Sequence, residues 1–181
     1  MGKRPLAPTL LWLVLISCLA SWNTRAQADP ANGFALYLGP VYSQIRCSTC
    51  QTVTSSGISL NGDAQMALND RWTLNPYLEL SSEHTNSSYT LFNGSAGLQA
   101  RFWVNHWFAG GQFLFHSENR HQNGTITAGI YGPALGLVTG WEGDDHWSIV
   151  LEVNSFEGQG LDWSYNNTRT DARIQIGYRW Y

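Results

Sequence analysis

The chain is short of lysine, cysteine and long apolar runs, and each shortage excludes a class of protein. Lys3 is the only lysine among 181 residues, and there are three cysteines. The longest apolar run, 10–20, is too short to cross a bilayer as a helix. No stretch after residue 29 shows the 3.6-residue apolar period of an amphipathic helix. The sequence therefore predicts an all-β chain without a helical membrane span.

The first 28 residues have the pattern of a secretory signal peptide. Lys3 and Arg4 precede the apolar run, and the tripeptide AQA at 26–28 follows it as a small-x-small cleavage site. The sequence thus predicts a signal peptide over 1–28 and one mature domain over 29–181. An alternative stays open, because LISC at 15–18 resembles a lipoprotein cleavage box that would leave Cys18 lipidated.

The charge and cysteine content of the mature part narrow its function. Seven arginines face thirteen carboxylates, a net charge of −6 with histidine neutral, which argues against nucleic acid as a partner. Cys47 and Cys50 form one C-x-x-C, with no second C-x-x-C or histidine pair at zinc spacing. In an exported chain this pattern favours a disulfide that staples a loop over redox chemistry or zinc binding. We expect no metal and no cofactor.

Apolar and polar residues alternate along the mature chain, which is typical of strands with one apolar and one polar face. The alternation predicts eight strands, over 34–45, 57–68, 72–83, 89–104, 107–116, 125–141, 147–156 and 170–181. Tight turns at 69–71, 105–106 and 143–146 alternate with looser polar segments at 46–56, 84–88, 117–124 and 157–169. Most strands have about ten residues or more, which is enough for a tilted strand to cross a bilayer.

Eight such strands close into a barrel, and its outer face distinguishes two classes. A secreted lipocalin-like carrier would turn its apolar face inward around a ligand, whereas a membrane barrel turns it outward to lipid. Six tryptophans flank the tight turns or the C-terminus, which predicts one interfacial ring at one rim: Trp72, Trp103, Trp107, Trp141, Trp147 and Trp180. This ring favours the membrane barrel.

Charged residues occupy the parity opposite the apolar rows. In a membrane barrel they form an interior polar network in which charges compensate one another, because an isolated buried charge is costly. The predicted members are Asp63, Glu79, Arg101, Glu152 and Arg173, together with Asp171.

The last strand, IQIGYRWY, is rich in aromatics, as expected of a strand that must pair with the first to close a barrel. Its GYRW at 177–180 resembles the ending of the small OmpX/Ail and OmpA-barrel type of outer-membrane proteins. The resemblance implies an eight-stranded antiparallel transmembrane up-and-down β-barrel, with short periplasmic turns and longer outer loops, in the Gram-negative outer membrane. It also implies a terminal signal for the barrel-assembly machinery in Tyr178, Trp180 and Tyr181. We expect Trp180 to contribute more to assembly than Tyr181, because Trp180 shares the parity of the apolar row.

Some barrels of this size are enzymes that act on lipid A, so candidate catalytic residues need weighing. Lipid A deacylases of the PagL type carry H-x-S-N, in which histidine and serine share a face and can act as base and nucleophile. Here His116 and Ser117 are adjacent and point to opposite faces, while Glu118 shares the face of His116. We therefore expect no catalytic residue. The alternative is a lipid A hydrolase that uses His116 with Glu118 or with a serine brought near by the fold. A metal site of His84, His116 and His121 has no diagnostic spacing.

What remains is a non-enzymatic barrel, structural or adhesin-like, whose binding function lies in its loops. We expect any ligand to contact the loop of Cys47 and Cys50 or that of Trp163 and Tyr165. The expected partners are outer-membrane lipid and lipopolysaccharide, the assembly machinery, and a host or other surface ligand. We expect the protein to be a monomer.

Overall fold

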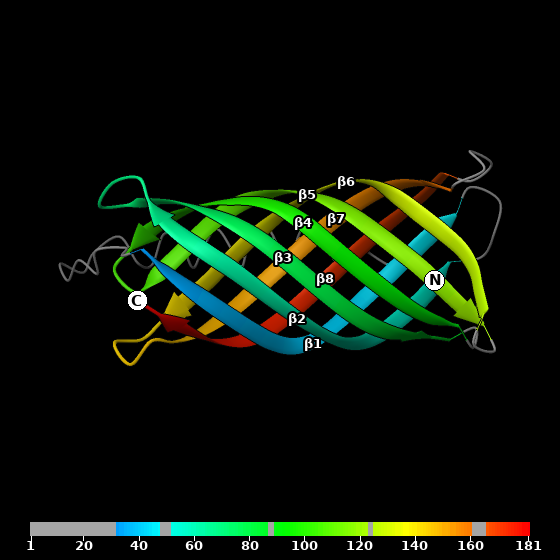
Figure 1. Cartoon of the computed structure of the whole chain (residues 1–181), viewed down its shortest axis with the longest axis horizontal. Helices are drawn as coiled ribbons and strands as arrows, with labels where there is room; N and C mark the ends of the chain where they lie inside the picture. The colour runs from blue at the N-terminus through cyan, green and yellow to red at the C-terminus, as the bar shows by residue number, and fades with distance from the viewer. Residues whose placement is uncertain (1–31, 48–51, 87–88, 123–124, 161–165) are drawn as a thin grey trace, which may run out of the picture.

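The computed structural model describes residues 32–47, 52–86, 89–122, 125–160 and 166–181. They form eight strands: β1 (Gly33–Cys47), β2 (Val53–Ala67), β3 (Trp72–Thr85), β4 (Thr90–Val104), β5 (Trp107–Gln122), β6 (Thr125–Glu142), β7 (Trp147–Gly160) and β8 (Asn166–Trp180). Each strand pairs antiparallel with its neighbours, and β1 pairs with β8, from Phe34 opposite Trp180 to Cys47 opposite Asn167. The chain is thus a closed up-and-down barrel, as the sequence predicts (Figure 1). None of the described residues belongs to a helix long and apolar enough to cross a membrane.

Short turns at 68–71, 105–106 and 143–146 lie at one end of the barrel. β1 begins and β8 finishes at this end, which is at the left of Figure 1. We call it the turn end and the opposite one the far end. Asn105 (φ 56°) and His146 (φ 68°) adopt the left-handed backbone conformation in two of these turns.

Polar side chains fill the barrel and apolar ones cover it. In β3, Leu78 is 67% exposed on the outside, whereas Glu79, the next residue, is 2% exposed inside. The same alternation runs through the other strands, so most buried polar and charged side chains face the lumen, while the exposed large hydrophobics form an outer apolar band. This is the polarity of a membrane barrel and the reverse of a soluble carrier.

Several strands continue past the predicted ends into segments predicted as loops. β5 continues to residue 122 instead of 116, β7 to 160 instead of 156, β2 begins at 53 and β8 at 166. The connections left at the far end are shorter than predicted. The prediction ended these strands where the outward apolar alternation stops, but the backbone ladder needs no apolar side chains to continue.

Three outward-facing prolines interrupt the ladder on one side each. The pairing breaks between β1 and β8 beside Pro40, between β2 and β3 beside Pro76, and between β6 and β7 beside Pro133, while the register is the same on both sides of each break. Each proline stays paired on its other side. The break follows from the missing N–H of proline, which cannot donate to the neighbouring strand.

Inward-facing glycines make room for aromatic rings in the lumen. A Cβ at Gly177 would meet the ring of Tyr37, and a Cβ at Gly158 would meet the Phe156 ring and a methyl group of Ile130. The large lumen side chains therefore fit because specific neighbours have none.

We predict that Gly158→Ala lowers the free energy of unfolding by about 1–3 kcal/mol through overpacking. Phe156→Leu in the same chain should restore part of this loss. Gly62→Ala is the control, because its added methyl meets nothing nearer than 3.4 Å. Urea unfolding of the refolded barrel measures all three; equal stability of the two alanine variants would contradict the packing account.

Candidate functional site

The lumen at the turn end is tied across by two arginines. Asp63 of β2 lies 2.5 Å from Arg101 of β4 and 3.1 Å from Arg179 of β8. The Tyr37 hydroxyl donates to Asp63 (3.0 Å) and accepts from Arg179 (2.8 Å). Arg179 also lies 2.9 Å from Glu142. This turn-end group joins β1, β2, β4, β6 and β8 across the lumen.

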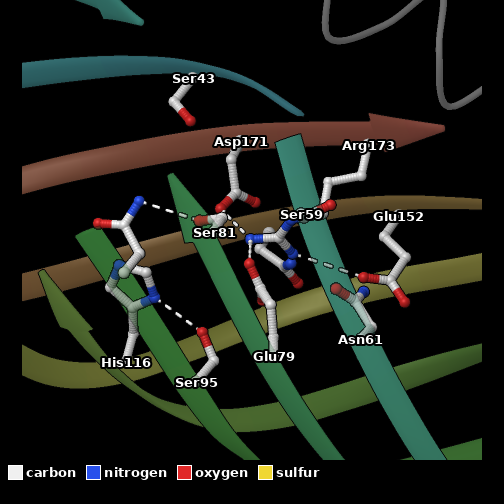
Figure 2. Close-up of polar contacts among 12 residues, drawn as sticks. Ser43, Ser59, Asn61, Glu79, Ser81, Ser95, His116, Glu152, Asp171 and Arg173 are labelled. Carbon is white, nitrogen blue, oxygen red and sulfur yellow. Dashed lines mark hydrogen bonds and ion pairs between the residues drawn. The ribbon is translucent and has the colours of Figure 1, made fainter. Parts of the chain in front are cut away.

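In the middle of the lumen, three carboxylates surround one guanidinium. Arg173 lies 2.6 Å from Glu79, 2.7 Å from Asp171 and 3.4 Å from Glu152. Figure 2 shows these side chains converging, with Glu79 from β3, Glu152 from β7, and Asp171 and Arg173 from β8. The Tyr77 hydroxyl donates to Glu152 at 3.0 Å. This middle group holds three acids on a single arginine.

A third group lies toward the far end. Arg169 pairs with Glu83 and lies 2.8 Å from Glu118. Ser43 and Ser55 donate to Glu83 at 2.7 and 2.6 Å. In this far-end group, Glu83 and Glu118 lie in the lumen and both pair with Arg169.

The three groups form one continuous network along the lumen. Asp171 contacts both Arg173 (2.7 Å) and Arg169 (3.7 Å), which joins the middle and far-end groups. Gln99 accepts from Arg101 at 3.1 Å and donates to Glu152 in the middle group at 3.2 Å. Apolar clusters fill the remaining lumen: Ala35, Tyr37, Trp103, Phe108, Val138 and Val150, and Tyr77, Leu114, Ile130, Ala134 and Phe156. The interior is thus packed by its own side chains.

The structure buries all the sequence-predicted network residues in the lumen and links them as described. Sequence reasoning missed five further charged members: Glu83, Glu118, Glu142, Arg169 and Arg179. The signal was present, because Glu83 and Arg169 continue the parity of Glu79 and Asp171. They were overlooked because they stood at a predicted strand end or in a predicted loop.

His116 has a serine beside it that the sequence did not reveal. Its Nδ1 lies 2.8 Å from the Oγ of Ser95, the residue opposite it on β4 (Figure 2). Its ring centroid lies 4.5 Å from that of Phe156. His116 and Ser95 are both buried. Ser117 lies on the opposite face, as predicted, and Glu118 pairs with Arg169. The pair has the components of a nucleophile and base, but packed side chains enclose it.

The three histidines considered as metal ligands do not converge. His116 is inside the barrel, whereas His84 and His121 lie on its outer face. Within the described ranges, no three His, Cys, Asp or Glu side chains are grouped as a metal site requires.

Four of the six ring tryptophans point outward near the turn end with about half their surface exposed: Trp72, Trp107, Trp147 and Trp180. Trp141 is half-buried. The prediction is wrong for Trp103, which lies inside, donates to Thr73 at 3.1 Å and packs against Phe108. Its position shares the inward parity of Arg101, so proximity to a turn misled the assignment where parity would have corrected it.

The end of β8 presents two different environments. Trp180 lies outside against Phe34 and Tyr178, whereas the Tyr181 hydroxyl donates to Glu142 at the rim. Burial, and then this hydrogen bond, raises the pKa of the Tyr181 phenol above its ordinary value. The assembly role of Tyr178, Trp180 and Tyr181 stays a prediction.

Some predicted features lie outside the described residues. These are the signal peptide, Cys50, and the loop aromatics Trp163 and Tyr165. Cys47 is described only as the last residue of β1, so the disulfide also stays a prediction.

Comparison with known proteins shows likeness in fold only. No family model and no curated protein sequence matches the chain. Among solved structures, the chain is similar to Ail, the attachment invasion locus protein of Yersinia pestis, with a TM-score of 0.59, 12% identity, and coverage of 82% of this chain and 99% of Ail. Neisserial surface protein A matches with a TM-score of 0.53 and 10% identity, over 81% of this chain and 95% of its own. OprG from Pseudomonas aeruginosa matches with a TM-score of 0.50 and 12% identity, over 86% of this chain and 99% of its own. These are small barrels, which agrees with the resemblance seen in the sequence.

We predict that Arg173→Met destabilises the barrel by about 3–5 kcal/mol, because it leaves buried Glu79 and Glu152 without a cation and Asp171 with Arg169 alone. Arg46→Met is the matched control: Arg46 is exposed on β1, and we expect a change within about 0.5 kcal/mol. Denaturant unfolding of both variants supplies the measurement. Equal stability would show that the middle group does not need its arginine.

Proposed function

We propose that the protein is an integral barrel of the bacterial outer membrane, non-enzymatic, with a structural or surface-binding role at its far end. One observation carries the membrane assignment: the outer face is an apolar band, while charged side chains are buried and paired inside. An apolar band of this kind is stable only against lipid or another apolar surface.

The outward tryptophans support the same location. They gather near the turn end, and indoles favour the bilayer interface. A lipocalin-like carrier needs an apolar lumen, whereas ion pairs connect the walls of this lumen along its length. The lumen therefore does not suit an apolar ligand. The fold shared with small outer-membrane barrels favours the outer membrane, with the short turns on the periplasmic side.

Binding at the far end is the more specific part of the proposal. The structure of Ail in complex with the heparin analogue sucrose octasulfate has the same fold (TM-score 0.56, 10% identity, covering 82% of this chain and 99% of Ail). For this chain we propose a ligand-binding far end on a rigid scaffold, since the network immobilises the wall that carries it.

A lipid A hydrolase is the second candidate, and the Ser95–His116 hydrogen bond is the observation that favours it. The burial of the pair argues against this function, because the ester of an acyl chain has to reach the serine hydroxyl and Phe156 lies against the histidine. We therefore assign this pair to the structural interior.

We predict that the protein partitions with outer membranes and migrates faster on gels unheated than boiled, because a closed barrel resists detergent. Lipid A from cells with and without the protein should give the same mass spectrum. Recovery as a soluble periplasmic monomer would refute the membrane proposal.

The non-enzymatic part has its own controls. The non-enzymatic proposal would be refuted if cells with the protein lost an acyl chain from lipid A, and if His116→Ala and Ser95→Ala each abolished that loss. Unchanged lipid A in all strains would support it.

A further inference from the structure

Six outward side chains on β3, β4 and β5 form a compact patch near the far end. Two cross-strand rows make it up: Ser82, Phe92 and Asn119, and above them His84, Thr90 and His121. All six lie on the outer face and are exposed or partly exposed. We call these residues the Phe92 patch.

The patch combines one accessible aromatic ring with a rim of hydrogen-bonding groups. Phe92 is 47% exposed, and the His121 ring meets it edge to face at 4.9 Å. Thr90 Oγ1 lies 3.3 Å from His84 Nδ1, so these two side chains support each other beside the ring. The hydroxyl, amide and imidazole groups supply both donors and acceptors.

The patch contains no carboxylate, lysine or arginine. The same strands turn their carboxylates inward, where Glu83 and Glu118 pair with Arg169. The outward side chains of the patch are therefore hydrogen-bonding groups around a single ring. A sugar fits this surface, because its C–H face packs on an aromatic ring while its hydroxyls bond to flanking polar groups. A protein partner would need more large apolar anchors than one phenylalanine.

The position of the patch identifies the source of the sugar. Leu80 of β3 and Phe115 of β5 are outward members of the apolar band, 66% and 58% exposed. Leu80 lies two residues before Ser82 of the patch, and Phe115 lies four residues before Asn119 on the same strand. Polar groups immediately above a lipid-facing band meet the headgroup layer of the same leaflet. We propose that the Phe92 patch binds a sugar unit of a glycolipid in the outer leaflet. This inference rests on the proposed membrane location and assigns its lipid contact to named residues.

The test uses the mature barrel refolded in detergent and titrated with rough lipopolysaccharide, followed by amide NMR shifts. We expect shifts at β3–β5 around residues 82–92 and 119–121. Phe92→Ala should raise the Kd about tenfold, or about 1.4 kcal/mol. Phe92→Leu, which keeps an apolar side chain and the fold but removes the ring, should weaken binding in the same direction. Phe115→Ala makes the same truncation lower on the outer face and should leave the Kd within about twofold.

Three outcomes would overturn the patch: a Kd that Phe92→Ala and Phe92→Leu leave unchanged, an equal loss with Phe115→Ala, or shifts confined to the turn end. Titration with phosphatidylglycerol tests the need for sugar, since equally tight binding would also overturn it. Failure of the proposed function looks different. A barrel that does not insert into phosphatidylglycerol vesicles refutes the membrane location, whereas an inserted barrel with an unaffected Kd refutes only the sugar site.

Discussion

Closure of β1 onto β8 is the constraint on which the rest of the structure depends. A strand wall surrounded by lipid has no water to satisfy an open edge, so every strand must pair on both sides. Closure gives the wall an inside too narrow for an open channel, and it forces alternate side chains into that space. The choice of inward residues then decides between a ligand cavity and a packed interior.

This chain fills the interior with paired charges and aromatic rings. Each buried charge would be destabilising alone, and the network compensates it with opposite charges and hydrogen bonds. The buried cations are all arginines, and three of them, Arg169, Arg173 and Arg179, each contact two or more carboxylates. A planar guanidinium with five donors suits such multiple contacts better than a lysine ammonium does. The scarcity of lysine in the sequence is thus consistent with a lumen whose buried cations are arginines.

Most of what the sequence could predict came from the alternation of apolar and polar residues along each strand. The period of two identifies the strands and the inward charges such as Glu79 and Arg173, because side-chain direction on a strand is fixed locally. Strand ends at the far end were misplaced, since backbone pairing continues where apolar alternation stops. Partners across the lumen, such as Asp63 for Arg179, depend on the register of strands distant in sequence. Even the neighbouring pair Ser95 and His116 depends on the register between β4 and β5. Trp103 was predicted to face outward only because it stands next to a turn. The alternation along β4 would have placed it inside.

The account stands on apolar side chains facing lipid and charges facing inward. The most direct test is a set of nuclear Overhauser effects between detergent acyl chains and leucine methyl groups of the refolded barrel, which needs no substitution. We expect acyl-chain contacts at the outward methyls of Leu78, Leu80 and Leu135 and none at the inward methyls of Leu91 and Leu114. Contacts at Leu91 and Leu114, with Leu78 and Leu80 silent, would contradict the account and indicate a carrier with an apolar lumen.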